Sequence, residues 1–287
     1  KIMKELKIAI QKSGRLSENS KRLLQECGIK FSNGTGILKT KAINFPVEIL
    51  FLRDDDIPQY VEQGVADAGI VGENMVSEKG RDIRIIEKLG FARCRLSLAI
   101  PKDEDYPGLH FFNGKKIATS YPRLLSDFLK KNNLKSEIEE ISGSVEIAPG
   151  IGLADAVCDI VSSGSTLLTN GLKEVATIMD SQAILVANKN LDEKKLNILN
   201  KLVFRINAVK NAKENKYILL NAPEDAVERI AGILPGMKSP TILPLMEKGW
   251  VSLHSVVRED DFWERIDMLR EAGAEGILVI PIEKMIK

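Results

Sequence analysis

The chain has 287 residues, with 41 basic and 40 acidic side chains and a formal net charge of +1. This length predicts about two domains, which can bury sizeable cores without disulfides or a structural metal. A net charge so close to zero excludes the strongly basic surface that neutralises many nucleic-acid phosphates, but it leaves room for a local basic pocket. We therefore expect no nucleic-acid partner.

The three cysteines, Cys27, Cys94 and Cys158, are far apart and form no CxxC pair. Their odd number and wide spacing argue against a disulfide framework and a cysteine zinc site, and favour buried thiols in a reducing compartment. The longest apolar runs, such as residues 277–280, are far too short to span a bilayer, and residues 1–6 show no signal-peptide pattern. We expect a cytoplasmic protein without membrane contact.

The first two-thirds of the chain alternates short apolar runs with amphipathic segments. Strands are predicted at residues 6–11, 47–53, 68–71, 117–119, 145–147 and 159–161. Helices are predicted from a cap at Ser17 to Gly28, from Asp56 with Pro58 in the first turn, over residues 123–132, from about Gly152, and from Thr166. This alternation predicts an α/β fold with a mostly parallel sheet covered by helices.

The sequence contains a weak internal echo. Residues 64–72 read GVADAGIVG, and residues 152–156 read GLADA, followed by the similar apolar run at 159–162. The spacing differs by a few residues, so chance is the alternative explanation. A true repeat would indicate two similar α/β lobes with a cleft between them, where ligands bind outside the carboxyl ends of the strands.

The last third follows a different pattern. Residues 192–213 are predicted to form a long amphipathic helix, with Leu196, Leu199, Leu202 and Val203 on one side. Strands then follow at residues 217–221, 241–245, 250–257 and 276–280, with helices at 224–234 and 260–272. This β-α-β-β-α-β order is typical of a ferredoxin-like module, whose boundary we expect near residue 208.

A hydroxyl-rich loop follows the predicted strand at residues 159–161. It consists of Ser162, Ser163, Gly164, Ser165 and Thr166. Hydroxyls and backbone N–H groups at the start of a helix suit a phosphate, and a glycine lets the backbone approach the anion closely. An ordinary helix cap is the alternative interpretation. The loop lacks the lysine of a nucleotide P-loop, which disfavours simple nucleotide hydrolysis.

Charged side chains lie near the expected phosphate site. Asp155 and Asp159 stand just upstream of the loop, where a carboxylate would repel a phosphate unless it binds sugar hydroxyls or a metal such as Mg²⁺. Helix capping is the alternative for Asp155. Arg15 and Arg53 follow predicted strands, and the arginine fork suits polyphosphate, although either one alone could be a solvated surface residue.

Only two histidines are present, His110 in a polar loop and His254 in the ferredoxin-like module. Neither belongs to a Ser–His or Cys–His arrangement. Acid–base or covalent catalysis by histidine is therefore disfavoured, whereas catalysis by positioning and charge stabilisation remains open.

Taken together, the motifs resemble those of the ATP phosphoribosyltransferase family, the first enzymes of histidine biosynthesis, in its long form. The similarity covers essentially the whole chain and is carried by residues 8–16, 53–58, 69–74, 94–99, 118–122, 152–166, 234–236, 240–245 and 280–285. Ser163 stands where the family often has threonine, and serine keeps the hydroxyl.

The resemblance implies a glycosyltransferase that joins N1 of the adenine of ATP to C1 of phosphoribosyl pyrophosphate and releases pyrophosphate, with Mg²⁺ as cofactor. It also implies that Ser162, Ser163, Gly164, Ser165 and Thr166 hold the 5′-phosphate of phosphoribosyl pyrophosphate. By the same resemblance, Asp155 or Asp159 lies near the ribose hydroxyls, and Arg15 and Arg53 face the pyrophosphate or the ATP phosphates.

The resemblance further implies two periplasmic-binding-protein-like lobes around a cleft and a C-terminal ferredoxin-like (ACT-like) regulatory domain. Lobe I would comprise residues 1–100, completed by about 182–207, lobe II residues 101–181, and the regulatory domain residues 208–287. Histidine would inhibit by binding at Asn221, Met237, Thr241, Val256 and Gly276. Asn221 stands where an acidic residue can occur. Homo-oligomers, dimers exchanging with hexamers, are implied as well.

A non-catalytic, two-lobed small-molecule binding or sensor protein is the alternative, because two-lobed clefts and small amino-acid-binding modules also serve that role.

Overall fold

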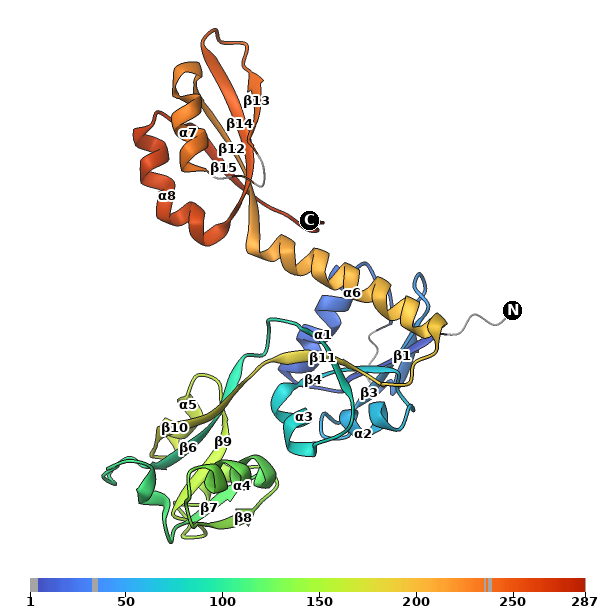
Figure 1. Ribbon diagram of the computed structural model, residues 1–287, viewed down its shortest axis with the longest axis vertical. Coiled ribbons are helices and arrows are strands. Elements are labelled where there is room, and N and C mark those ends of the chain that lie inside the picture. The colour runs from blue at the N-terminus through green and yellow to red at the C-terminus, as the bar shows by residue number, and fades with distance from the viewer. Residues whose placement is uncertain (1–4, 33–35, 235, 237–238, 287) are drawn as a thin grey trace. The chain divides into compact units, whose positions relative to one another are not determined.

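The computed structural model describes residues 5–32, 36–234, 236 and 239–286. The chain divides into two compact units, residues 1–199 and 200–287 (Figure 1). The division falls inside helix α6 (Glu193–Glu214), and the boundary expected near residue 208 lies in the same helix. Among the described residues, none of the helices has the length and apolar character needed to cross a membrane.

The first sheet of the N-terminal unit has six strands in the order β2-β3-β1-β4-β11-β5. Its strands are β1 (Leu6–Gln11), β2 (Lys39–Lys41), β3 (Val47–Leu52), β4 (Ala68–Gly72), β5 (Arg84–Lys88) and β11 (Ala183–Ala187). Helices α1 (Arg15–Glu26), α2 (Ile57–Glu62) and α3 (Glu73–Lys79) connect the early strands. We refer to these elements as lobe I.

Strand β1 pairs in parallel with both β3 and β4. The loops that follow these strands therefore emerge at the same edge of the sheet, as the Lys12 N–H donating to Leu52 O at 2.7 Å shows. The expected strand 6–11 and the helix start at Asp56 are confirmed. The prediction that Ser17 caps the first helix was wrong, because Gly14 precedes α1 and Ser17 lies buried within the helix.

The second sheet has five strands in the order β10-β6-β9-β7-β8. They are β6 (Cys94–Pro101), β7 (Lys116–Thr119), β8 (Glu137–Glu140), β9 (Ala156–Val161) and β10 (Leu172–Ser181). The helices are η1 (Leu109–Phe112), α4 (Pro122–Lys131), η2 (Val145–Ile147) and α5 (Ser165–Thr169). We refer to these elements as lobe II.

Two predictions for lobe II were wrong. Residues 145–147 form the 3₁₀ helix η2 instead of a strand, and only Val145 of this segment is buried. No helix begins at Gly152, which adopts a left-handed turn with φ of +74°. A three-residue apolar run is too short for its periodicity to separate a strand from a helical turn.

The chain passes between the lobes twice, from β5 to β6 and from β10 to β11 (Figure 1). Strands β6 and β10 form a long antiparallel pair, with Ser181 opposite Cys94 at one end and Leu172 opposite Pro101 at the other. Residues 94–100, which were expected in lobe I, therefore belong to the sheet of lobe II. This pair of connections joins the two lobes.

The internal echo corresponds to a repeated set of hydrogen bonds. In lobe I, Asp67 Oδ2 accepts the Lys7 N–H at 2.8 Å, and the Asp67 N–H donates to Lys7 O at 2.9 Å. In lobe II, Asp155 Oδ2 accepts the Lys116 N–H at 2.8 Å, and the Asp155 N–H donates to Lys116 O at 2.8 Å. Each aspartate thus joins the start of one parallel strand to the start of its neighbour.

The C-terminal unit has a four-stranded antiparallel sheet in the order β13-β14-β12-β15. Its elements are β12 (Asn215–Pro223), η3 (Glu224–Ala226), α7 (Val227–Ile233), β13 (Thr241–Pro244), β14 (Trp250–Arg258), α8 (Glu259–Glu271) and β15 (Glu275–Pro281). This order confirms the predicted β-α-β-β-α-β module.

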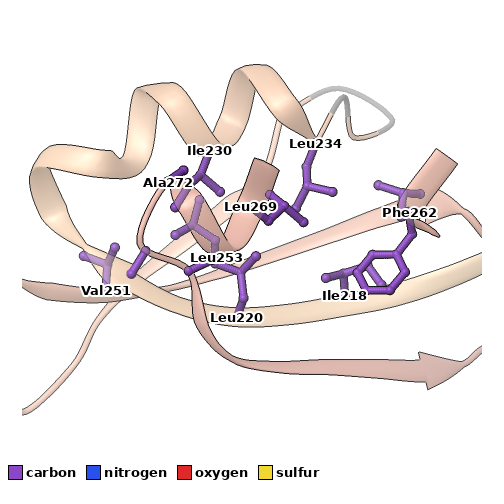
Figure 2. Packing of buried hydrophobic residues seen from close by; sticks show 12 residues of the cluster. Ile218, Leu220, Ile230, Leu234, Val251, Leu253, Phe262, Leu269 and Ala272 are labelled. Atoms are coloured by element: carbon purple, nitrogen blue, oxygen red, sulfur yellow. The ribbon is translucent and has the colours of Figure 1, made fainter. Parts of the chain in front are cut away.

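One face of this sheet packs against both helices. Alternate residues Ile218 and Leu220 of β12 and Leu253 of β14 contact Ile230 of α7 and Leu269 of α8, and all five are almost fully buried (Figure 2). The period-2 alternation of a strand sends the intervening residues to the opposite face, on which the described residues of this unit place no helix.

Candidate active site

The hydroxyl-rich loop connects β9 to the short helix α5. Gly164 precedes the helix with φ of +82°, a left-handed conformation that favours glycine. The hydroxyls of Ser163 and Ser165 lie 2.9 Å apart and are hydrogen-bonded to each other. Ser162, Ser163, Ser165 and Thr166 are all exposed, so the loop presents a group of hydroxyls that can meet a polar ligand.

Arg15 reaches this loop from the other lobe. A cavity of about 290 Å³ is lined by Arg15, at the start of α1 in lobe I, and by residues 160–167 of lobe II. The structure therefore brings together one predicted arginine and the whole predicted hydroxyl loop. A guanidinium facing several hydroxyls is suited to an anionic ligand such as a phosphate.

Asp159 lies on β9 shortly before the loop and is partly buried. Burial, assisted by the negative charge of Glu146, raises the pKa of Asp159 to about 6, although the Ile160 N–H donates to its Oδ1 at 2.7 Å and opposes this shift. A carboxylate with this pKa is mostly ionised at neutral pH, but its ionised form is less favourable than that of a carboxylate in water. It would gain from a ligand that donates hydrogen bonds or carries positive charge.

Tyr121 and Asp54 were not among the predicted site residues. Burial raises the pKa of the Tyr121 hydroxyl, and the nearby negative charges of Asp159 and Asp54 raise it further. Burial, followed by the charge of Asp55, also raises the pKa of Asp54. Each lies two residues after the end of a strand that belongs to a parallel pair, so the rule that ligands bind at the carboxyl ends of strands could have identified them.

A second cavity, of about 480 Å³, extends between the lobes. Its lining includes Asp55 and Glu78 of lobe I, and Ser120, Tyr121 and Glu140 of lobe II. The Tyr121 hydroxyl accepts a hydrogen bond of 3.1 Å from Asn74 Nδ2, which lies in lobe I. Groups from both lobes thus face one cleft.

Two predicted site residues stay apart from the loop. Asp155 precedes β9, whereas the loop follows it, so the length of a six-residue strand separates them, roughly 20 Å. Arg53 is largely exposed and forms a 3.3 Å ion pair with Asp55. Arg95 lies nearer to the loop: its Nη1 donates to Ser162 O at 3.5 Å, while its guanidinium is paired with Glu174.

Across the described part of the chain, no three His, Cys, Asp or Glu side chains group into a metal site. A divalent cation such as Mg²⁺ commonly uses only one or two protein carboxylates together with substrate phosphates. Asp159 and Asp54, both near Tyr121, are carboxylates of this kind. The donor set therefore fits a cation that arrives with a phosphorylated substrate.

The predicted regulatory residues gather in the C-terminal unit. The register places Asn221 of β12 opposite Ser252, Thr241 of β13 opposite His254, and Val256 of β14 opposite Tyr217, so all belong to the face without helices. Asn221 Nδ2 lies 3.5 Å from the position of a Cβ at Gly276, whose φ is +57°. Met237 lies outside the described residues.

The chain is similar to known proteins over almost its whole length. A model described as ATP phosphoribosyltransferase matches residues 53–208, and one described as HisG, C-terminal domain, matches residues 212–284. The ATP phosphoribosyltransferases of Cytophaga hutchinsonii and Bacteroides thetaiotaomicron are 61% and 60% identical to this chain, covering 98% of it and 99% of each relative.

Solved structures agree with these matches. The ATP phosphoribosyl transferase (HisG:HisZ) complex from Thermotoga maritima contains a chain that is 30% identical, with a TM-score of 0.60 over 70% of this chain and 98% of that one. A substrate-binding protein of an amino acid ABC transporter is 11% identical with a TM-score of 0.50, which shows a shared periplasmic-binding-protein-like fold alone. The chain belongs to the ATP phosphoribosyltransferase family, transferases of histidine biosynthesis.

Proposed function

We propose that the protein transfers the phosphoribosyl group of phosphoribosyl pyrophosphate to N1 of ATP, giving N1-(5-phosphoribosyl)-ATP and pyrophosphate. The observation that carries this proposal is the cavity in which Arg15 of lobe I faces the hydroxyl loop of lobe II. Membership of the family supports it. The non-catalytic sensor loses its support, because the similar proteins are named as enzymes over almost their full length.

The residues can be assigned roles in this reaction. Ser162, Ser163, Ser165 and Thr166, with the backbone at Gly164, would hold the 5′-phosphate by hydrogen bonds. Ionised Asp159 would accept hydrogen bonds from the ribose hydroxyls. Asp155 is assigned no such role here, because it lies at the other end of β9.

The bond changes need no strong base. The bond between C1 and the pyrophosphate oxygen breaks, the bond between C1 and adenine N1 forms, and N1 carries no proton that must be removed. Negative charge gathers on the leaving pyrophosphate, and in our proposal Arg15 stabilises it, with Arg53 as a second arginine at the same sheet edge. Mg²⁺, bound with the substrate, would supply further charge neutralisation.

The reaction itself provides the test. Protein supplied with ATP, phosphoribosyl pyrophosphate and Mg²⁺ should release pyrophosphate and produce an adenine alkylated at N1, detected by mass spectrometry. We expect Arg15→Ala to lower kcat/KM by about 100-fold, the order found when a transition-state donor is removed. Arg22→Ala is the matched control, because Arg22 lies on the same helix and bonds Asn19 instead. Absence of pyrophosphate release from the metal-supplied wild type would refute the proposal.

We further propose that histidine binds the helix-free face of the C-terminal sheet, near Asn221, Thr241, Val256 and Gly276, and inhibits the enzyme. Histidine binding can inhibit catalysis only if histidine favours one conformational or oligomeric state of the protein. We propose that these states are homo-oligomers in the cytoplasm, namely dimers and hexamers.

Asn221→Asp should tighten histidine binding, since a carboxylate attracts the ligand's amino group. Calorimetry would measure this, and no binding to either protein would contradict the site.

A further inference from the structure

Helix α4 of lobe II begins without a cap of its own. Tyr121 precedes the helix and its side chain makes no capping bond, and Pro122 in the first turn has no N–H. The next two N–H groups, those of Arg123 and Leu124, precede the first hydrogen bond of α4, which runs from the Leu125 N–H to Tyr121 O. Their N–H groups therefore need an acceptor from elsewhere.

The acceptor is Glu78, on α3 of lobe I. Its Oε1 accepts the Arg123 N–H at 3.0 Å, and its Oε2 accepts the Leu124 N–H at 2.9 Å. Each carboxylate oxygen thus satisfies one amide of the first turn. The negative charge also lies at the positive end of the α4 dipole, which stabilises the contact.

In a second contact, a side chain of lobe II lies against helix α3 of lobe I. Helix α3 ends at Lys79, and Gly80 follows in a left-handed conformation with φ of +56°. Arg123 Nη1 lies only 1.3 Å from the position that a Cβ at residue 80 would occupy. The guanidinium of lobe II can therefore lie across the end of α3 only because residue 80 is glycine.

A residue of the same helix α3, Asn74, also binds the side chain of Tyr121. Asn74 Nδ2 donates to the Tyr121 hydroxyl at 3.1 Å, and Asn74 Oδ1 accepts the Ser181 hydroxyl at 2.8 Å. Ser181 ends β10, the strand that leads back to lobe I. Tyr121 is thus fixed between α3 and the connection of the lobes, where it lines the cavity of about 480 Å³.

We propose that Glu78 is a positioning residue: by capping α4 across the lobe interface, it holds the lobes closed and keeps Tyr121 at the cavity between them. Its kinetic consequence rests on the proposed transferase function. When the cap is lost, fewer molecules are closed before substrate arrives, and the apparent affinity falls by that fraction. The chemical step in the closed complex is left nearly intact.

The test compares Glu78→Gln with Glu62→Gln. Glutamine keeps the shape of the side chain but presents one acceptor and one donor where two amides need acceptors. Glu62 makes a similar pair of contacts within lobe I, accepting from the Asp82 N–H at 2.8 Å and from Arg81 Nη1 at 3.1 Å. It therefore controls for the loss of a carboxylate contact inside one lobe.

We expect hydrogen exchange at the Arg123 and Leu124 amides to accelerate about tenfold in Glu78→Gln, within the range for a lost helix cap. The KM values for both substrates should rise about three- to tenfold with kcat changed less than about twofold, and Glu62→Gln should show neither effect.

Unchanged exchange at the two amides would overturn the proposal, and so would faster exchange with unchanged KM values, because the cap would then serve stability alone. Exchange is measured without substrates. A wild-type protein that protects both amides and yet shows no turnover would therefore refute the transferase function and not the capping contact.

Discussion

Lobes I and II repeat one arrangement and differ where the strands end. Asp67 and Asp155 each tie together the starts of two parallel strands through the same pair of backbone bonds. At the other end, β4 runs directly from Gly72 into α3, whereas β9 leads into the exposed hydroxyl loop. The scaffold is shared by both lobes, whereas the hydroxyl groups that we propose bind the 5′-phosphate belong to lobe II.

The cleft nevertheless needs both lobes. Lobe I supplies Arg15 to the hydroxyl loop and Asn74 to Tyr121, and these contacts join residues that are far apart in the sequence. In our proposal, lobe II holds the phosphorylated sugar and lobe I completes the site. The predictions below challenge that division of roles.

The largest effect is expected for Asp159→Asn. Removing the carboxylate that would bind the ribose hydroxyls should lower kcat/KM by about 100-fold, measured by pyrophosphate release. Asp127→Asn, an exposed position of the same lobe, is the control and should retain wild-type turnover. Wild-type turnover in Asp159→Asn would remove this residue from the site.

The Asp159→Asn variant should also have a higher free energy of unfolding than the wild type above pH 6. Burial raises the pKa of Asp159 from 3.8 in the unfolded chain to about 6. As pH rises from about 4 to 6, the unfolded chain loses this proton while the folded chain keeps it, so stability falls and stays lower above pH 6. Asparagine removes this cost, at most about 3 kcal/mol, and chemical denaturation should show the gain disappearing below pH 4.

A second test compares two glycines of lobe II. Gly164 in the hydroxyl loop and Gly152 at the other end of β9 have φ values of +82° and +74°, and no neighbouring atom lies closer than 3.9 Å to a Cβ at Gly164. Alanine at either position should cost about 1 kcal/mol of unfolding free energy through backbone strain alone. Only Gly164→Ala should raise the KM for phosphoribosyl pyrophosphate, by about tenfold. Equal KM values in both variants would argue against phosphate binding by the hydroxyl-rich loop.

Local patterns in the sequence identified the parts of the fold that depend on neighbouring residues. Residues 6–11 were placed correctly because a mostly apolar run, interrupted only by Lys7, marks a buried parallel strand, and the β-α-β-β-α-β order followed from alternation between 217 and 287. The hydroxyl loop was found because its residues are consecutive. Asp155 was grouped with it by sequence proximity, although an extended strand moves its two ends far apart.

Contacts between distant segments could not be read in this way. Glu78 caps a helix 45 residues later, and Asn74 meets Ser181 across 107 residues. Nothing local to either residue reveals its partner, because the pairing depends on how the two lobes are joined. The β6–β10 pair that joins them was also missed, since its register is interrupted by two shifts that break a simple strand pattern.

The smallest effect on activity is expected from the two repeated aspartates. Asp67 is almost fully buried and forms a 2.7 Å ion pair with Lys195, whereas Asp155 is about half exposed and its Oδ1 lies 4.0 Å from Lys115 Nζ. Asp67→Asn should therefore lower the unfolding free energy by about 3 kcal/mol, since it leaves a lysine without its buried partner, and Asp155→Asn by less than about 1 kcal/mol. Neither should alter the KM for phosphoribosyl pyrophosphate, as both aspartates lie at the strand ends remote from the cleft. A strong KM effect in Asp155→Asn would return this residue to the substrate site and end the equivalence of the two aspartates.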